Sequence, residues 1–144
     1  MLATAAALAT AGALVVLTVM WAPDGTAAGE RHPLGPGPAT VELDIHHSRF
    51  SQERVDIRPG TVLRFVVTNG DPILHELVVG DDAVHARHAT GTEAAHPAVP
   101  GEVSVRPGEV GETTLRFDQP GTFAFACHLP GHLRYGMHGE VVVG

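Results

Sequence analysis

Most of the chain after residue 40 alternates between apolar and polar positions with a period of two. The alternation is clearest over residues 41–45, and it is interrupted by turn sequences such as Arg58-Pro59-Gly60 and Asn69-Gly70-Asp71-Pro72. A period of two is typical of strands with one buried face, and Pro-Gly and Asn-Gly pairs end strands. The pattern predicts strands over residues 41–45, 55–57, 61–68, 75–79, 102–105, 112–117, 122–127 and 139–143.

This number of short strands predicts an all-β domain. The chain holds 17 Gly and 11 Pro in 144 residues, which leaves little room for long helices. Seven to eight strands at this spacing are typical of a Greek-key sandwich or barrel. Residues 81–100 break the alternation and are rich in Ala and His. We interpret them as an insertion that forms a loop or a short helix.

The N-terminal segment has a different composition. Residues 2–22 carry no charged side chain and are rich in Ala, Leu and Val. Such a stretch is long enough to span a bilayer, and the small residues Thr26-Ala27-Ala28 also suit a signal-peptide cleavage site. Residues 1–28 are therefore predicted to be a signal peptide or an N-terminal membrane anchor. Both alternatives place the domain outside the cytoplasm, in the periplasm or at the extracellular face, either secreted or anchored.

The segment that follows, residues 29–40, is rich in Gly and Pro, and we predict a semi-rigid linker there. Residues 41–144 then form one domain, which we expect to be monomeric. The formal net charge of −7 argues against nucleic acid as the main partner, because a phosphate backbone would repel the protein.

Four residues carry donor atoms that suit copper. Cys127, His132 and Met137 follow one another at five-residue steps in the predicted last hairpin, and His75 begins a predicted strand far upstream. One thiolate, two imidazoles and a thioether are the ligands of a trigonal redox copper with a weak axial Met. Zinc suits the set less well, because structural zinc sites do not use a thioether and Cys127 is the only cysteine.

The run Cys127-x4-His132-x4-Met137, preceded by residues 121–126 and paired with His75, resembles the cupredoxins, or blue copper proteins. Its loop spacing is similar to that of auracyanin and rusticyanin. Residues 75–81 and 130–137 also look like small exported cupredoxins linked to copper tolerance. The resemblance covers roughly residues 41–144 and implies one type 1 copper ion that cycles between Cu(I) and Cu(II). By this resemblance His75 and His132 bind it through ring nitrogens, Cys127 through its thiolate and Met137 as the long axial ligand.

Two further residues are candidates for supporting this site. Because Pro130 has no N–H, Leu129 is the nearest loop residue able to donate a hydrogen bond to the Cys127 sulfur. Asn69 is a candidate for bracing the loop that precedes His75.

A four-ligand site leaves no open position for a substrate, so we expect an electron carrier and not an enzyme. Redox protein partners would dock transiently near His132, with Arg134 and Glu76 steering them. The surrounding apolar residues are Leu129, Pro130, Leu133 and Tyr135.

The alternative function is copper tolerance, in which the protein buffers or delivers copper. A second, His-rich site could serve it, formed by His85, His88 and His96, with His46 and His47 elsewhere in the chain. The competing interpretation is a solvated Ala- and His-rich loop. His128 follows Cys127 directly, but Ala126 stands where a His-Cys-His relay would need its first histidine. We therefore expect His128 to lie on the surface or a strand face.

Overall fold

The computed structural model describes residues 33–90 and 98–144. The predicted leader, residues 29–32 of the predicted linker and His96 lie outside the described residues. Within them the chain forms eight strands and one helix. These are β1 (Gly37–Ile45), β2 (Arg54–Ile57), β3 (Thr61–Asn69), β4 (His75–Gly80), α1 (Asp82–Ala89), β5 (Glu102–Val105), β6 (Val110–Phe117), β7 (Gly121–Ala126) and β8 (His138–Val143). The described part of the chain contains no helix of the length and apolarity that a membrane crossing requires.

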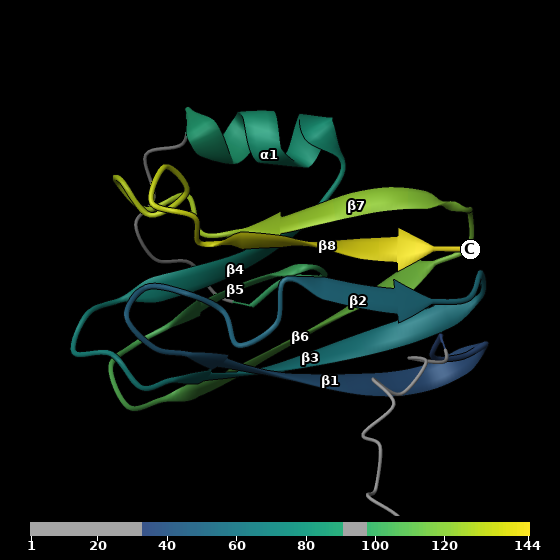
Figure 1. Ribbon diagram of the computed structural model, residues 1–144, viewed down its shortest axis with the longest axis horizontal. Helices are drawn as coiled ribbons and strands as arrows, with labels where there is room; N and C mark the ends of the chain where they lie inside the picture. Colours follow the sequence, from purple (N-terminus) through teal and green to yellow (C-terminus); the bar gives the residue numbers. More distant parts are fainter. Residues whose placement is uncertain (1–32, 91–97) are drawn as a thin grey trace, which may run out of the picture. The chain divides into compact units, whose positions relative to one another are not determined.

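The strands form two sheets that pack face to face (Figure 1). One sheet has the order β1-β3-β6 and the other β2-β8-β7-β4-β5. The pairs β1–β3 and β2–β8 are parallel, and the remaining pairs are antiparallel. The predicted all-β sandwich is therefore confirmed, with the strands close to their expected positions.

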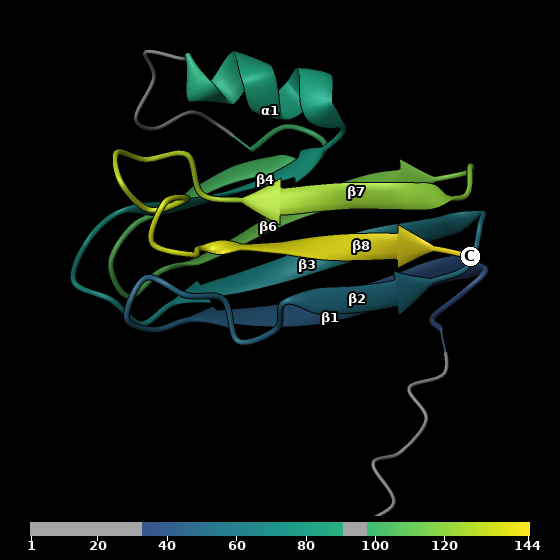
Figure 2. The same ribbon diagram turned by 45° about the horizontal axis from the view of Figure 1, so that its top comes forward.

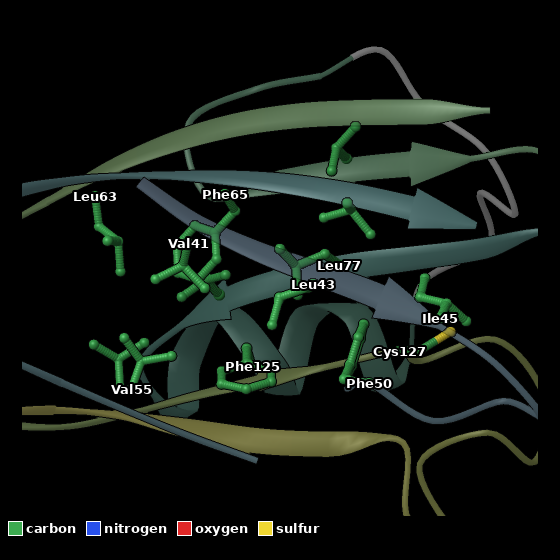
Figure 3. Close-up of a cluster of buried hydrophobic side chains, with 14 of the residues drawn as sticks. Val41, Leu43, Ile45, Phe50, Val55, Leu63, Phe65, Leu77, Phe125 and Cys127 are labelled. Carbon is green, nitrogen blue, oxygen red and sulfur yellow. The ribbon is translucent and has the colours of Figure 1, made fainter. Parts of the chain in front are cut away.

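The core lies between the two sheets and follows the alternation in the sequence. In β3, for example, Leu63, Phe65 and Val67 are fully buried, while Arg64 between them is exposed. Figure 3 shows side chains from both sheets meeting in this layer, with Cys127 at one end of it beside Ile45. The same apolar layer that stabilises the sandwich therefore also surrounds the cysteine.

Strand β4 differs from the others because all six of its residues are buried. It lies between β5 and β7 in its sheet, and helix α1 packs against it and against β7. In a strand that is covered on both faces, every residue is buried, and buried and exposed residues no longer alternate. His75 and Glu76 at its start are consequently buried polar residues.

The first strand begins at Gly37, within the segment predicted to be linker, instead of at Val41. Residues 37–40 pair with residues 61–64 of β3. The linker prediction is wrong for these four residues, because β1 lies at the edge of its sheet, where a proline such as Pro38 is tolerated.

The insertion forms a helix of eight residues, α1, where we expected a loop or short helix. Asp81 caps it: the Val84 N–H donates to the Asp81 carboxylate at 3.0 Å. Asp82 lies in the first turn, and Arg87 and His88 lie in the last, which suits the helix dipole. In Figure 2 the helix lies above β7, close to the loop that joins β7 to β8. The insertion is therefore next to the predicted metal loop.

Candidate metal centre

Three of the four predicted ligands meet at one end of the sandwich. The candidate donor atoms of His75, Cys127 and His132 all lie within 4.8 Å of one another. Cys127 Sγ is 3.2 Å from His132 Nδ1, and the rings of His75 and His132 have centroids 4.8 Å apart. His75 is the first residue of β4, and Cys127 directly follows β7. Because β4 and β7 are paired neighbours, the fold brings these distant segments together.

Met137, the fourth predicted ligand, is fully buried at the base of the same loop. The Cys127 N–H donates to the Met137 carbonyl oxygen at 3.1 Å, and the Met137 N–H donates to the His132 carbonyl oxygen at 3.1 Å. Backbone hydrogen bonds among Cys127, His132 and Met137 therefore close the loop at its base.

Two glycines shape the loop and the start of β8, the strand that follows it. Gly136 has a φ of 91°, in the left-handed region that glycine occupies without strain. At Gly139 an added Cβ would lie 2.2 Å from the Phe125 ring and 2.7 Å from the Glu53 carbonyl oxygen. A side chain at this position would collide with the core directly below the loop.

His75 has one nitrogen that fits a metal. Its Nε2 is 2.9 Å from the Asp71 carboxylate, whereas its buried Nδ1 has no hydrogen-bond partner among the described residues. A buried nitrogen without a partner costs free energy. A copper ion held with Cys127 and His132 would satisfy it, so the residues present fit the metal that the donor set suggests.

Asp71 holds His75 from the far side, a role that the sequence did not reveal. Its carboxylate accepts the N–H groups of His47 and Ser48 at 2.7 Å each, as well as the contact with His75. Burial acts to raise the pKa of Asp71, but these hydrogen bonds outweigh it and lower the pKa below its usual value. The carboxylate stays ionised and orients the ring, as partners of metal-bound histidines commonly do. Burial also lowers the pKa of His75.

The sulfur of Cys127 is shielded from solvent. Burial raises the pKa of its thiol to about 11, although hydrogen bonds from the backbone N–H groups of Glu76 and Leu129 act in the opposite direction. Leu129 is thus a donor to the sulfur, as predicted, and Glu76 is a second donor that sequence reasoning missed. Without metal the thiol is protonated at neutral pH, so copper binding must release a proton.

Glu76 is buried, although we expected it at the surface near His132. It is only 2% exposed, and its Oε1 accepts the His128 N–H at 2.7 Å. The prediction that it steers partners at the surface is therefore wrong, because β4 is covered on both faces.

Asn69 braces the loop before His75, as predicted. Its amide donates to the carbonyl oxygens of Ile73 at 2.8 Å and Val105 at 2.9 Å, and its oxygen accepts the Asp71 N–H at 2.9 Å. The last of these bonds helps to fix the residue that orients His75.

His128, which we expected on the surface or a strand face, lies in the loop directly after β7. It is half-buried and faces His85 and His88 from helix α1. Burial and these two neighbouring rings lower its pKa. We call His85, His88 and His128 the histidine cluster. His46 and His47 are exposed on the loop after β1, and His96 lies outside the described residues.

His132 reaches the surface in an apolar setting. It is half-buried, and next to it Leu133 and Tyr135 are 42% and 71% exposed. Leu129 instead packs against the core. A groove of about 500 Å³ lies here, lined by Ala89, His128, Leu129, Gly131, Leu133, Arg134 and Tyr135.

This fold and this donor set define a copper-binding domain of the cupredoxin type. The chain belongs to the family described as copper binding proteins, plastocyanin/azurin family, whose sequence profile matches residues 39–144. The predicted resemblance and the predicted copper cofactor are confirmed.

Among its relatives, the copper-resistant cuproprotein CopI of Rubrivivax gelatinosus is 41% identical over 98 residues, which make up 66% of this chain and 59% of the relative. The chain thus spans about three-fifths of that relative's length. Auracyanin-B of Chloroflexus aurantiacus is 30% identical, over 65% of this chain and 46% of the relative. The solved auracyanin B structure is 27% identical with a TM-score of 0.58 and covers 73% of this chain and 88% of that one.

The contact between Asp71 and His75 predicts the effect of replacing the carboxylate. Asp71→Asn should weaken Cu(II) binding by roughly 10–100-fold, the usual cost of losing such a partner. Competition with a chelator of known affinity measures the change. Asp44→Asn, on the exposed side of β1, is the matched control and should bind copper as the parent does. Equal affinities of the parent and Asp71→Asn would contradict the role of Asp71.

Burial of Cys127 predicts a loss of stability at alkaline pH in the metal-free domain. The pKa of the thiol is raised from 9.0 to about 11 in the folded state. The unfolded chain therefore loses its proton first, and the stability that is fully present below pH 9 falls as pH rises through 11. The fall should be on the order of 2–3 kcal/mol. Urea unfolding of the parent and Cys127→Ser at pH 8 to 11 measures it, and a parallel decline in both proteins would contradict the assignment.

Proposed function

We propose that this protein is a mononuclear type 1 copper protein that carries single electrons between redox partners outside the cytoplasm. The observation that carries the proposal is the buried donor set of His75, Cys127 and His132, whose candidate donor atoms lie within 4.8 Å of one another. In the proposed site these three residues bind the ion, and Met137 is the weak axial ligand.

The surroundings of these ligands favour electron transfer over catalysis. His75 and Cys127 are fully buried, and Met137 is buried beneath the loop. The N–H groups of Glu76 and Leu129 hold the sulfur, and Asp71 holds His75. A site fixed by the protein in this way changes little between two oxidation states and leaves no position for a substrate.

His132 is the proposed route for the electron. Its ring is half-buried, and the exposed side chains of Leu133 and Tyr135 lie in the same loop. A small apolar surface suits partners that dock weakly and leave quickly. The exposed Arg134 in this loop could help to attract an acidic partner.

Copper tolerance is the second candidate function. The observation that favours it is the similarity to CopI of Rubrivivax gelatinosus, 41% identical over 98 residues, which is named a copper-resistant cuproprotein. The two functions are compatible, since a protein exported by the predicted leader could carry electrons for a copper-handling system.

Removal of the thiolate tests the copper centre. The parent should bind one copper at the centre with a strong thiolate charge-transfer band in the visible spectrum, and it should cycle reversibly between two oxidation states without releasing the metal. Cys127→Ser should lose the band, because no other thiol exists in the chain. Visible spectroscopy and copper analysis before and after repeated redox cycles measure both properties. A parent without the band would contradict the type 1 site, and copper release on each cycle would favour delivery over electron carriage.

A charge placed on the apolar patch tests the route of the electron. Leu133→Glu should slow electron self-exchange between Cu(I) and Cu(II) copies roughly tenfold or more, since it places like charges opposite each other when two patches meet. NMR line broadening in mixtures of the two forms measures the rate. Val110→Glu is the matched control, because Val110 is an exposed residue of β6. Equal slowing in both variants would reflect net charge alone and would contradict docking at this patch.

A further inference from the structure

The histidine cluster gathers three imidazoles from two elements beside the copper centre. His85 and His88 are three residues apart on α1 and therefore lie on neighbouring positions of the helix surface. His128 approaches them from the loop after β7: its Nε2 is 2.8 Å from His85 Nδ1. No residue of the cluster belongs to the donor set described above.

Oxygen acceptors hold the outer nitrogen of both helix histidines. Nε2 of His85 is 3.1 Å from the carbonyl oxygen of Ala124, and Nε2 of His88 is 3.1 Å from the carboxylate of Glu102. A neutral ring that donates its Nε2 proton to oxygen keeps an unprotonated Nδ1. Metal-binding histidines are commonly held in this way through the nitrogen that does not bind the metal. His85 would therefore bind a metal through Nδ1, the nitrogen that faces His128.

The spacing of His85 and His128 suits a shared ion, whereas the donor nitrogens of all three rings do not lie within 4.8 Å of one another, so His88 would have to turn to complete the site. Two nitrogens bound to one ion at ~2.0–2.1 Å and at a right angle are roughly 2.9 Å apart, close to the 2.8 Å between His85 Nδ1 and His128 Nε2. Imidazoles that share an ion at such bond lengths have ring centroids roughly 4.5–6.4 Å apart. The ring centroid of His128 is 5.1 Å from that of His85 and 5.8 Å from that of His88.

We propose that the histidine cluster binds a second metal ion, for which Cu(II) is the best match. Imidazoles without thiolate or thioether suit Cu(II) better than Cu(I), and Cu(II) binds nitrogen ligands most tightly among the divalent first-row metals. Near-right-angle nitrogens also fit the tetragonal geometry that Cu(II) prefers. This site is distinct from the type 1 centre, and its occupation does not depend on the proposed electron carriage.

The two sites are linked through the backbone. His128 is the next residue after Cys127, and its N–H is held by the Glu76 carboxylate at 2.7 Å. The N–H of Glu76 in turn donates to the Cys127 sulfur. A metal in the cluster would therefore be held by the residue adjacent to the sulfur ligand of the first copper.

Titration of the full chain tests the second site. The protein, already loaded with one copper, is titrated with Cu(II) and followed by electron paramagnetic resonance and by chelator competition. We expect a second equivalent whose spectrum lacks thiolate character. His85→Gln and His88→Gln should each weaken its binding at least ~tenfold, since losing even an indirect partner costs about that much. The visible band of the first copper should stay unchanged in both variants.

His46→Gln is the matched control, because His46 is an exposed histidine outside the cluster. It should bind the second equivalent as the parent does. Helix α1 has no buried residue, so both helix variants should fold, and circular dichroism verifies this. Failure of the parent to bind a second equivalent, or parent-like affinity in both helix variants, would overturn the proposal. Loss of the visible band in the parent would instead contradict the type 1 centre.

Discussion

The pairing of β4 with β7 is the constraint on which the metal centre depends. Val78 lies opposite Ala126 in this antiparallel pair, so His75 and Cys127 come together at the same end of the sheet. A slip of one residue would turn the side chains of one strand to the other face and separate the ligands. The complete burial of β4 opposes such a slip, because its apolar residues already fill both layers around it. The stability of the sandwich and the geometry of the copper site thus rest on one register.

The strands and ligands could be predicted because their signals are local. Alternation along β3 and the spacing of Cys127, His132 and Met137 are visible in the sequence without any partner segment. Helix α1 could be predicted only as a loop or a short helix, because it buries no residue and so has no apolar stripe. The roles of Asp71 and Glu76 could not be predicted, since each depends on contacts that exist only after distant strands pair.

Two carboxylates lie close to the ligand residues and would influence the redox behaviour of the proposed copper site. Asp71 is hydrogen-bonded to the ring of His75, and Glu76 is hydrogen-bonded to the backbone of His128. Negative charge near a metal favours its more positive oxidation state. The hydrogen bonds from Glu76 and Leu129 to the Cys127 sulfur favour the reduced state, because they withdraw charge from the thiolate. In the proposed redox site, the reduction potential would therefore reflect a balance between the carboxylates of Asp71 and Glu76 and the N–H groups of Glu76 and Leu129.

The position of β1 at the edge of its sheet has a consequence for solubility. An edge strand exposes backbone groups that can pair with another chain and start aggregation. In β1, Pro38 has no N–H to offer, and the exposed side chains of Glu42 and Asp44 carry negative charge along the same strand. Two copies that approached edge to edge would meet a missing donor and like charges. The proline that made this strand look like a linker in the sequence thus helps to keep the protein from growing into fibrils.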